Sequence, residues 1–362
     1  MTGITKHLHR SKWKCPSNIA LVKYWGKRDF QKPMNPSLSF VLQQAYTETS
    51  IELHREGGSK VEYYFDGKFS PFGERIEKYL DYISSKLPWI SKYNFTIRST
   101  NSFPHSAGIA SSASSFGALA LCIAEIDFSF SGREIESADF WKEASELARM
   151  GSGSACRSVF PGFSIWGQTQ LFESSSDDFA IRLTDGISLV FQGLRDAILL
   201  VDSGKKEVSS SAGHQLMEKH IYQRSRIAQA YENVNELYLA LLTGDLNKFM
   251  QIVENEALSL HAMMMTSNPS YVLLKPNSLE VINRIRRFRE KARIPVCFTI
   301  DAGPNIHLLY FQENELDVKA FIERELQQFC EDGKWIDDRI GGGPNRLTDG
   351  FKELFGTNWT NP

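Results

Sequence analysis

Apolar and polar residues alternate, or recur at helical spacing, along most of the chain. Residues 17–25 and 37–53 are rich in β-branched and aromatic side chains with partial alternation, which predicts strands. Residues 61–65 and 93–100 show the same strand pattern. Residues 71–87 repeat apolar side chains at helical spacing after a proline, which predicts a helix. The first hundred residues therefore predict mostly β-structure with one helix.

The pattern becomes more helical towards the middle of the chain and returns to mixed structure near its end. An apolar helix is predicted at 116–126, a polar helix at 133–149, and a buried strand at 187–201 with a turn near Gly193. The remaining predictions are mostly helical structure at 211–292, strands within 295–305 and 306–311, a helix at 315–329, and a strand and loop at 335–344.

This order predicts an α+β protein made of two interlocked α/β lobes, with the active site in the cleft between them. It consists of a mixed N-terminal half, a helical insertion and a closing β-α-β unit. We assign the lobes to residues 1–185 and 186–362.

Composition and charge narrow the class of protein. The chain is 42% hydrophobic and 23% charged, as is usual for a soluble globular protein. Its 41 basic and 43 acidic residues give a net charge of -2, which argues against nucleic acid or a membrane as the main partner. The five cysteines form no C-x-x-C pair, which favours a reducing compartment over disulfides or zinc. Without an apolar leader or an 18-residue apolar run, the sequence predicts a cytoplasmic protein.

Small residues gather at 104–114, between a predicted strand and a predicted helix. They allow close approach of a ligand, and the helix N-terminus offers free N–H groups and a positive dipole end to a phosphate. No G-K-[ST] follows, so the segment is not a Walker loop. Taken alone, such a helix start is more often tight packing. The candidate nucleotide-binding residues are Pro104, His105, Ser106, Ala107, Gly108, Ile109, Ala110, Ser111 and Ser112.

Three further segments carry polar groups suited to an anionic substrate. Lys23, Tyr24 and Lys27 follow an apolar strand, where cations either face an anionic ligand or form a solvated turn. The turn 151–158 offers hydroxyls and Arg157, whose guanidinium can pair with a carboxylate in a bidentate way. Asp301 ends a predicted strand, where a carboxylate is either a rigidly held base or a structural turn residue.

These segments together resemble the diphosphomevalonate decarboxylase family of the GHMP kinase superfamily. Residues 104–114 resemble the superfamily's ATP signature P-x-x-x-G-[IL]-[AG]-S-S-A-[AS]. The stretch NIALVKYWGKR at 18–28 looks like that decarboxylase branch, as do GSGSACRS at 151–158 and DAGPN at 301–305. The stretch KKEVSSSAGH at 205–214 adds weaker support. The resemblance implies a GHMP kinase fold.

The resemblance also implies roles for individual residues. ATP binds the segment 104–112, with Mg²⁺ at Ser112. The implied catalytic residues are Asp301 and Lys23, and mevalonate 5-diphosphate contacts Tyr24, Lys27, Ser152, Ser154, Arg157 and Ser210. The implied products are isopentenyl diphosphate, ADP, phosphate and carbon dioxide. Homodimers are common in the family, so the resemblance also implies a homodimer.

Some positions depart from the family's letters, so alternatives stay open. Ser102, His105 and Ser106 differ in the ATP signature, and Ser211 and His214 differ near the expected diphosphate site. A phosphomevalonate decarboxylase and a mevalonate 3-kinase are the related alternatives. A GHMP-fold binding protein without catalysis is an alternative of another class, although Asp301 and the phosphate loop are both kept.

Overall fold

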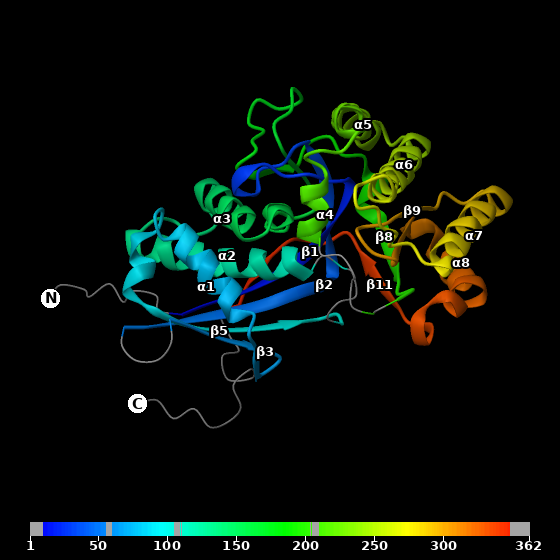
Figure 1. The fold of residues 1–362 in the computed structure, drawn as a ribbon. Coiled ribbons are helices and arrows are strands. Elements are labelled where there is room, and N and C mark those ends of the chain that lie inside the picture. The colour runs from blue at the N-terminus through cyan, green and yellow to red at the C-terminus, as the bar shows by residue number, and fades with distance from the viewer. Residues whose placement is uncertain are drawn as a thin grey trace.

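A computed structural model describes residues 10–55, 60–104, 109, 111–202, 204 and 210–347 of the 362-residue chain. The side chains of residues 210 and 211 lie outside this description. The described residues form an eight-stranded and a four-stranded sheet, each covered by helices (Figure 1). The α+β class and the two lobes expected from the sequence are confirmed.

The eight-stranded sheet comes mainly from the N-terminal half. Its main path runs β12-β1-β2-β5-β3-β4, while β6 pairs with β2 and β7 pairs with β6. Helices α1, α2 and α3 lie over one face of this sheet (Figure 1). The elements are β1 (Arg10–Val22), β2 (Ser37–His54), β3 (Val61–Phe65), β4 (Lys68–Phe69), α1 (Gly73–Ile83), β5 (Asn94–Asn101), α2 (Ser111–Ser131), α3 (Ala138–Gly151), β6 (Phe163–Trp166), β7 (Ala180–Leu183) and β12 (Asn345–Arg346).

The four-stranded sheet runs β11-β8-β10-β9 and is antiparallel throughout. Helices α5 to α8 gather around it in Figure 1. Its elements are β8 (Leu194–Leu199), α4 (Ser210–Leu216), α5 (Gln223–Thr243), α6 (Leu246–Met265), α7 (Pro276–Ala292), β9 (Cys297–Thr299), β10 (Ile306–Phe311), α8 (Glu315–Phe321) and β11 (Trp335–Arg339). Short 3-10 turns occupy Asp29–Gln31, Pro88–Lys92, Gly153–Arg157, Leu189–Gly193, Gln312–Asn314, Gln327–Phe329 and Glu331–Gly333, with a π turn at Ile322–Leu326.

The two lobes share buried surface rather than meeting only at a linker. One apolar cluster contains Phe163 of β6, Ile198 of β8 and Phe249 of α6. The carboxylate of Asp338 in β11 accepts hydrogen bonds of 2.8 Å from the backbone N–H groups of residues 43, 44 and 45 in β2. Burial raises the pKa of Asp338, and these backbone donors oppose that effect. The lobes are therefore joined by both apolar packing and a buried polar contact.

A buried glutamate explains how the end of the described chain returns to the first sheet. Glu125 lies in the apolar helix α2 and is 2% exposed. Its carboxylate accepts hydrogen bonds from Trp13 Nε1 at 2.6 Å and Arg346 Nε at 2.6 Å. Trp13 also pairs with Arg346 in the ladder between β1 and β12. The charge of Glu125 is thus neutralised by the C-terminal strand that it holds.

Helix α2 is long and apolar enough to cross a membrane by length and composition. It is the one such helix among the described residues, and 78% of its apolar window is buried inside the protein. This burial is typical of a helix in the core of a folded protein, so α2 is interpreted as a core helix. The five cysteines are all buried and free.

Several elements differ from their sequence-based prediction. The strand expected at 187–201 was wrong in its first part, because residues 189–193 form a 3-10 turn and β8 begins only after Gly193. Leu189 is 77% exposed, so its apolar character did not report burial. The helix expected at 315–329 ends after 321 in a π turn. The short strands β6 and β7 were not predicted, since four residues carry little periodicity.

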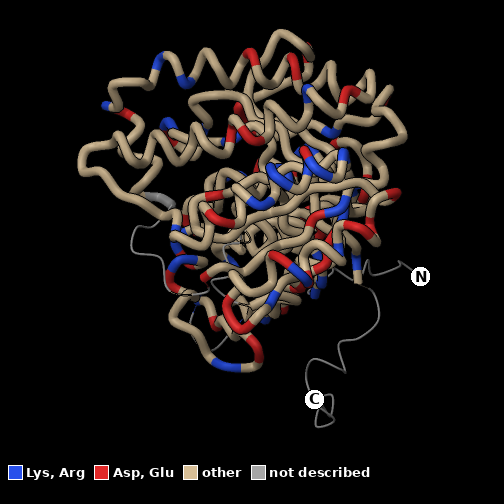
Figure 2. Tube along the Cα trace, turned by 90° about the vertical axis from the view of Figure 1, so that its right-hand side faces the viewer, with Lys and Arg blue, Asp and Glu red and all other residues tan. Residues whose placement is uncertain are grey.

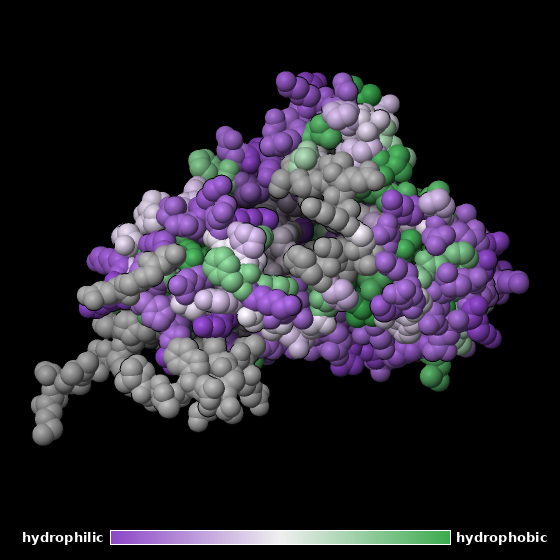
Figure 3. All heavy atoms as spheres, turned by 60° about the horizontal axis from the view of Figure 1, so that its bottom comes forward, coloured by the Kyte–Doolittle hydropathy of each residue, from purple (hydrophilic) through white to green (hydrophobic). Residues whose placement is uncertain are grey.

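Charged residues of both signs are interspersed along the described chain, as Figure 2 shows. The face in Figure 3 is mostly hydrophilic, with small scattered apolar groups and a hollow near its middle.

We expect Gly117→Ala to destabilise the protein, although alanine normally favours a helix over glycine. A Cβ at position 117 in α2 would lie 2.5 Å from Cys15 Sγ in β1, within a fully buried contact. The expected loss is about 1–3 kcal/mol of unfolding free energy, measured by urea denaturation. Gly342→Ala is the control, because nothing lies within 4 Å of its Cβ. Equal stability of the two variants would contradict this packing.

Candidate active site

An ion pair between the two lobes forms the centre of the site. Lys23 follows the end of β1, and Asp301 follows the end of β9 by two residues. Their side chains meet at 2.7 Å between Nζ and Oδ1, although 278 positions separate them in sequence. The Lys23 side chain is 2% exposed and that of Asp301 is 25% exposed. The pair thus sits at the edge of a buried region with the carboxylate partly open to solvent.

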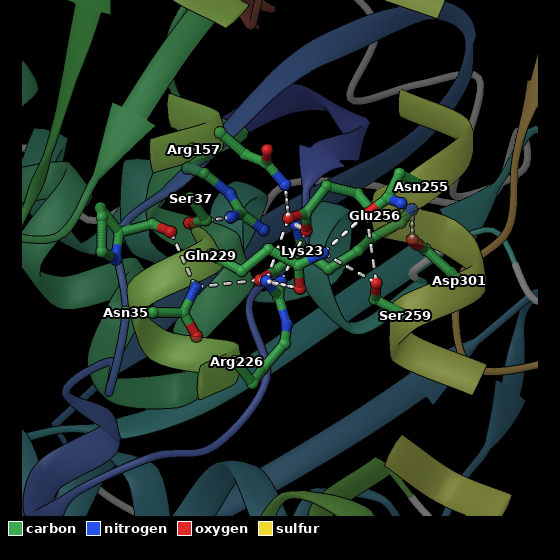
Figure 4. Close-up of polar contacts among 12 residues, drawn as sticks. Lys23, Asn35, Ser37, Arg157, Arg226, Gln229, Asn255, Glu256, Ser259 and Asp301 are labelled. Carbon is green, nitrogen blue, oxygen red and sulfur yellow. Dashed lines mark hydrogen bonds and ion pairs between the residues drawn. The ribbon is translucent and has the colours of Figure 1, made fainter. Parts of the chain in front are cut away.

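A second, fully buried ion pair lies behind Lys23, as Figure 4 shows. Glu256 of α6 is 0% exposed and accepts from the Lys23 backbone N–H at 2.8 Å. Arg226 of α5 donates to both oxygens of Glu256, at 3.0 and 2.6 Å, and Asn233 donates at 2.6 Å. The Lys23 carbonyl accepts from Arg226 at 3.2 Å and from Asn35 at 3.0 Å. Both backbone groups of Lys23 are therefore held.

His261 of α6 contacts the other member of the central pair. Its Nε2 lies 3.1 Å from the backbone carbonyl of Asp301. A carbonyl only accepts, so Nε2 carries the proton and donates. Burial, with the Lys23 charge, lowers the pKa of His261 to about 4, although the hydrogen bond and the charge of Asp301 oppose this shift. The imidazole is therefore neutral at neutral pH.

Arg157 is a buried cation in the 3-10 turn after α3. It is 2% exposed, and its Nη1 donates to Ser37 Oγ. Its guanidinium also lies 5.8 Å from the Trp166 ring centroid. Within the described ranges its Nε has no hydrogen-bond partner and no carboxylate forms an ion pair with it. Burial lowers the pKa of Arg157, and the nearby Asp301 charge partly offsets this. A carboxylate of a bound ligand would neutralise this buried guanidinium and accept a hydrogen bond from its Nε.

Tyr24, Lys27 and His214 lie on one side of this centre. The buried Tyr24 hydroxyl has no hydrogen-bond partner in the part of the chain that the structure describes, and burial raises the pKa of this phenol. Burial and the charge of Arg75 lower the pKa of Lys27. His214 packs against Tyr24 with ring centroids 4.4 Å apart, and its Nδ1 accepts from the Gly26 N–H at 3.0 Å.

The structure places the three serines that were predicted to bind substrate in different surroundings. Ser152 Oγ lies 3.3 Å from Ser112 Oγ, which joins the turn 151–158 to the start of α2. The Ser154 carbonyl accepts from Asn18 at 3.0 Å. Ser210 begins α4, but its side chain lies outside the described residues.

The phosphate segment is described only in part. Ser111 and Ser112 begin helix α2, five residues before the helix predicted at 116–126. The carbonyl of Ile109 accepts from Ser17 Oγ at 3.0 Å, and Pro104 is exposed. The predictions outside the described residues concern His105, Ser106, Ala107, Gly108 and Ala110.

Comparison with known protein families gives two matches along this chain. Residues 15–179 match the diphosphomevalonate decarboxylase-like N-terminal domain, and residues 197–346 match the mevalonate 5-diphosphate decarboxylase C-terminal domain. The diphosphomevalonate decarboxylase of Debaryomyces hansenii is 31% identical over 333 residues, covering 87% of this chain and 83% of that protein. The chain belongs to the diphosphomevalonate decarboxylase family.

Other members of this family agree along nearly the full length. The diphosphomevalonate decarboxylase of Rattus norvegicus is 27% identical over 362 residues, covering 94% of this chain and 86% of that protein. The crystal structure of mevalonate diphosphate decarboxylase from Staphylococcus aureus is 28% identical, with a TM-score of 0.82 over 94% of this chain and 98% of that one. A structure of MDDEF in complex with MVAPP, AMPPCP and magnesium is also 28% identical, with a TM-score of 0.80 over 93% and 98%.

Sequence reasoning missed part of the site of this family member. Glu256, Arg226, Ser37 and His261 were not among the candidates. A signal for Glu256 existed in the helical pattern. It occupies a position surrounded by the buried residues 252, 253, 257 and 260 of α6, where a charge needs a partner.

A separate groove of about 800 Å³ lies between α6 and α7, away from the Lys23–Asp301 pair. Its lining includes Arg286, Arg289 and Glu254. Both arginines already form ion pairs with Glu254. Both arginines are thus engaged by a protein carboxylate, and we place the site at the central pair and not in this groove.

We expect acid to destabilise the protein through its buried histidines. His261 and His214 have pKa values of about 4 and about 3, against 6.5 when exposed. Between these values the unfolded chain binds protons that the native protein does not, so the unfolding free energy falls as the pH drops below 6.5. The loss is at most about 1.4 kcal/mol per pH unit for each histidine.

Urea denaturation from pH 7 to pH 5 measures this dependence. His261→Gln removes one of the titrating groups, so its unfolding free energy should vary less with pH than that of the wild type. Identical pH slopes for both proteins would contradict the assignment of His261 as a buried neutral imidazole.

Proposed function

We propose that this chain catalyses the ATP-dependent decarboxylation of mevalonate 5-diphosphate to isopentenyl diphosphate, with release of ADP, phosphate and carbon dioxide. Family membership supports the reaction. The observation that carries it is the Lys23–Asp301 pair beside Arg157, a buried cation whose Nε has no partner among the described residues. The site thus brings together Asp301 as a base, Lys23 as a cation for the phosphoryl group, and Arg157 as a guanidinium for the substrate carboxylate.

In the first step, Asp301 accepts the proton of the substrate's C3 hydroxyl as this oxygen attacks the γ-phosphorus of ATP. The new O–P bond replaces the bond to the β-phosphate oxygen, and ADP leaves. Lys23 keeps Asp301 in place and stabilises negative charge on the transferring phosphoryl group. The N-terminus of α2, with Ser111 and Ser112, faces the nucleotide phosphates in this proposal.

In the second step, Arg157 holds the substrate carboxylate while the C3–O bond breaks and phosphate leaves. Positive charge develops at C3, and the electrons of the C1–C2 bond form the C2–C3 alkene as carbon dioxide departs. Tyr24, Lys27, Ser152, Ser154 and Ser210 are the proposed contacts to the rest of mevalonate 5-diphosphate. The Tyr24 hydroxyl fits the diphosphate because it has no hydrogen-bond partner in the described chain. The Lys27 ammonium fits it because burial disfavours the positive charge of Lys27, which a bound anion would stabilise.

A magnesium ion fits this site through Ser112. No cluster of three His, Cys, Asp or Glu side chains that could hold a metal occurs in the described ranges. Magnesium typically takes one or two protein groups, with phosphates and waters as its other ligands. The Ser112 hydroxyl, 3.3 Å from that of Ser152, is such a group. When bound, magnesium would neutralise charge on the ATP phosphates.

The direct test offers mevalonate, its 5-phosphate and its 5-diphosphate to the purified protein with ATP and magnesium. Equal release of ADP and carbon dioxide from the 5-diphosphate alone is expected. Release of both from the 5-phosphate would make the protein a phosphomevalonate decarboxylase, and ADP without carbon dioxide would make it a 3-kinase. Neither product from any substrate would contradict the proposal.

Asp301→Asn should lower kcat by about 10²–10⁴-fold, because the amide cannot accept the C3 proton. Carbon dioxide release under saturating substrate measures this loss. Binding of the 5-diphosphate, followed by calorimetry, should persist in the variant because other groups hold that substrate. A variant with wild-type kcat would remove Asp301 from the proposed mechanism.

Arg157→Lys should lower kcat/KM by about 10- to 100-fold, since an ammonium cannot copy the bidentate contact with a carboxylate. Arg149→Lys is the matched control. Arg149 is also 2% exposed, but it donates to the backbone of Asp178 and Phe30. The control should lose stability and keep its kcat/KM, and equal losses in both variants would argue against a carboxylate contact at Arg157.

We also propose that the lobes divide at about residue 185, between β7 and β8. Assignment of the strands to two sheets on either side of this point supports the division, although β12 belongs to the first sheet. The homodimer stays a prediction from the family resemblance, and the cytoplasmic location stays a prediction from the cysteines and the hydropathy of the sequence. Light scattering of the purified protein would test the first of them.

A further inference from the structure

We infer that helix α6 positions both members of the Lys23–Asp301 pair from behind, with Glu256 and His261 as the positioning residues. This inference rests on the proposed function, in which that pair carries the chemistry. The two contacts lie outside every role assigned above, and neither side chain reaches the reacting atoms in our mechanism. Figure 4 shows Glu256 gathered with Lys23, Arg226 and Asp301 in one cluster of polar contacts.

The first contact holds the backbone of Lys23. The pairing of β1 with β2 ends at Val22, one residue before Lys23. Beyond the sheet, the Lys23 N–H donates to Glu256 at 2.8 Å and its carbonyl accepts from Arg226 at 3.2 Å. Because the side chain starts from this same residue, fixing both peptide groups limits where its Nζ can lie. The buried pair thus replaces the missing strand partner.

The chemistry of Glu256 suits this task. A fully buried carboxylate is costly unless it is paired and hydrogen-bonded, and apolar side chains often fill such a place at lower cost. Arg226 and Asn233 of α5 satisfy the charge of Glu256. An ionised acceptor forms a stronger hydrogen bond to the Lys23 N–H than a neutral one would. A pair that served only the packing of α5 on α6 would not need to contact β1.

The second contact holds the backbone of Asp301. This residue lies beyond β9, which ends at Thr299. The carbonyl of Asp301 accepts from His261 Nε2 at 3.1 Å, and His261 is only 2% exposed. Fixing this carbonyl restricts the peptide next to the Asp301 side chain. The buried imidazole of His261 stays neutral, so this contact adds no charge beside the ion pair.

One helix carries both contacts, and this sets the relation between the two lobes. Glu256 and His261 are five positions apart on α6, which is about 7.5 Å along a helix axis. Lys23 comes from the first sheet and Asp301 from the second. A rigid helix that holds both keeps the ammonium and the carboxylate at a fixed separation. Misplacement of such groups by about 1 Å can cost about 10²-fold in rate.

The test removes each acceptor or donor while keeping size and fold. For His261, we compare His261→Gln, whose amide can donate, with His261→Leu, which cannot. For Glu256, we compare Arg226→Met/Glu256→Gln with Arg226→Met/Glu256→Leu. Both double variants remove the buried charge pair, and only the first keeps an acceptor for the Lys23 N–H.

The expected result is a loss of kcat in the leucine variants by about 10- to 100-fold, with an unchanged KM for the substrate. The glutamine variants should recover most of this loss. Hydrogen exchange at the Lys23 amide, followed by mass spectrometry or NMR, should speed up in the leucine double variant and not in the glutamine one. This readout needs no catalytic activity.

Matched controls come from the same helix and its neighbours. Glu254 of α6 pairs with Arg289, away from β1. His220 donates from Nε2 to the Met263 carbonyl at 3.0 Å and is 8% exposed, so it is a second buried histidine that holds a backbone carbonyl. Glu254→Gln and His220→Leu should lower the Tm and leave kcat unchanged.

Three outcomes would overturn the inference. They are wild-type kcat in the leucine variants, an equal loss of kcat in glutamine and leucine variants, and an equal loss of kcat in the controls. If the leucine double variant fails to fold, the His261 pair decides. A wild-type protein that releases no carbon dioxide would remove the proposed function instead, and hydrogen exchange at Lys23 would still test the positioning.

Discussion

The arrangement depends on one ion pair that joins the ends of two separate sheets. Lys23 leaves the first sheet at the end of β1, and Asp301 leaves the second sheet beyond β9. Neither sheet alone can bring the two charges together, so the contact exists only when both lobes are packed. The shared apolar cluster and the Asp338 contact to β2 supply that packing. The geometry of the site therefore depends directly on the stability of the interface between the lobes.

Buried charges in and around the site fall into two kinds, which explains why they differ in role. Glu256 and Arg226 satisfy each other and the backbone around them, so they need no ligand. Arg157 is equally buried, yet the described residues give it a serine hydroxyl and an aromatic face instead of a carboxylate. Burial without a counter-charge is unfavourable, and a bound anion relieves it. An incompletely satisfied cation is thus better evidence of a binding site than a cationic surface.

The sequence predicted most of the fold because long elements carry clear periodicity. The strand β2 and the helices α5 to α7 follow patterns that span many residues. The short strands β6 and β7 escaped because their four residues are defined by pairing with β2 and with each other. At 187–201, a strand was predicted with a turn near Gly193. The turn is present at 189–193, but Leu189 at its start is exposed and the strand begins only after Gly193.

The site was predictable where residues form a local motif and not where they depend on tertiary contacts. Lys23, Arg157 and Asp301 stand in recognisable stretches of sequence, and the structure brings them close together. Glu256 and His261 stand alone on a helix, so only the packing of α6 behind β1 and β9 reveals what they contact. Periodicity indicates that a face is buried, but it does not say which backbone group a polar side chain on that face will meet.

The return of β12 to the first sheet has a consequence for how the protein is made. The edge of β1 at Trp13 and Lys14 pairs with residues 345 and 346, and the buried charge of Glu125 meets Arg346. A ribosome releases these partners only after the whole second lobe has been synthesised. Until then the nascent first lobe carries an open strand edge and an uncompensated buried acid, both of which disfavour a finished fold. The last strand of the described chain, β12, therefore completes the first sheet.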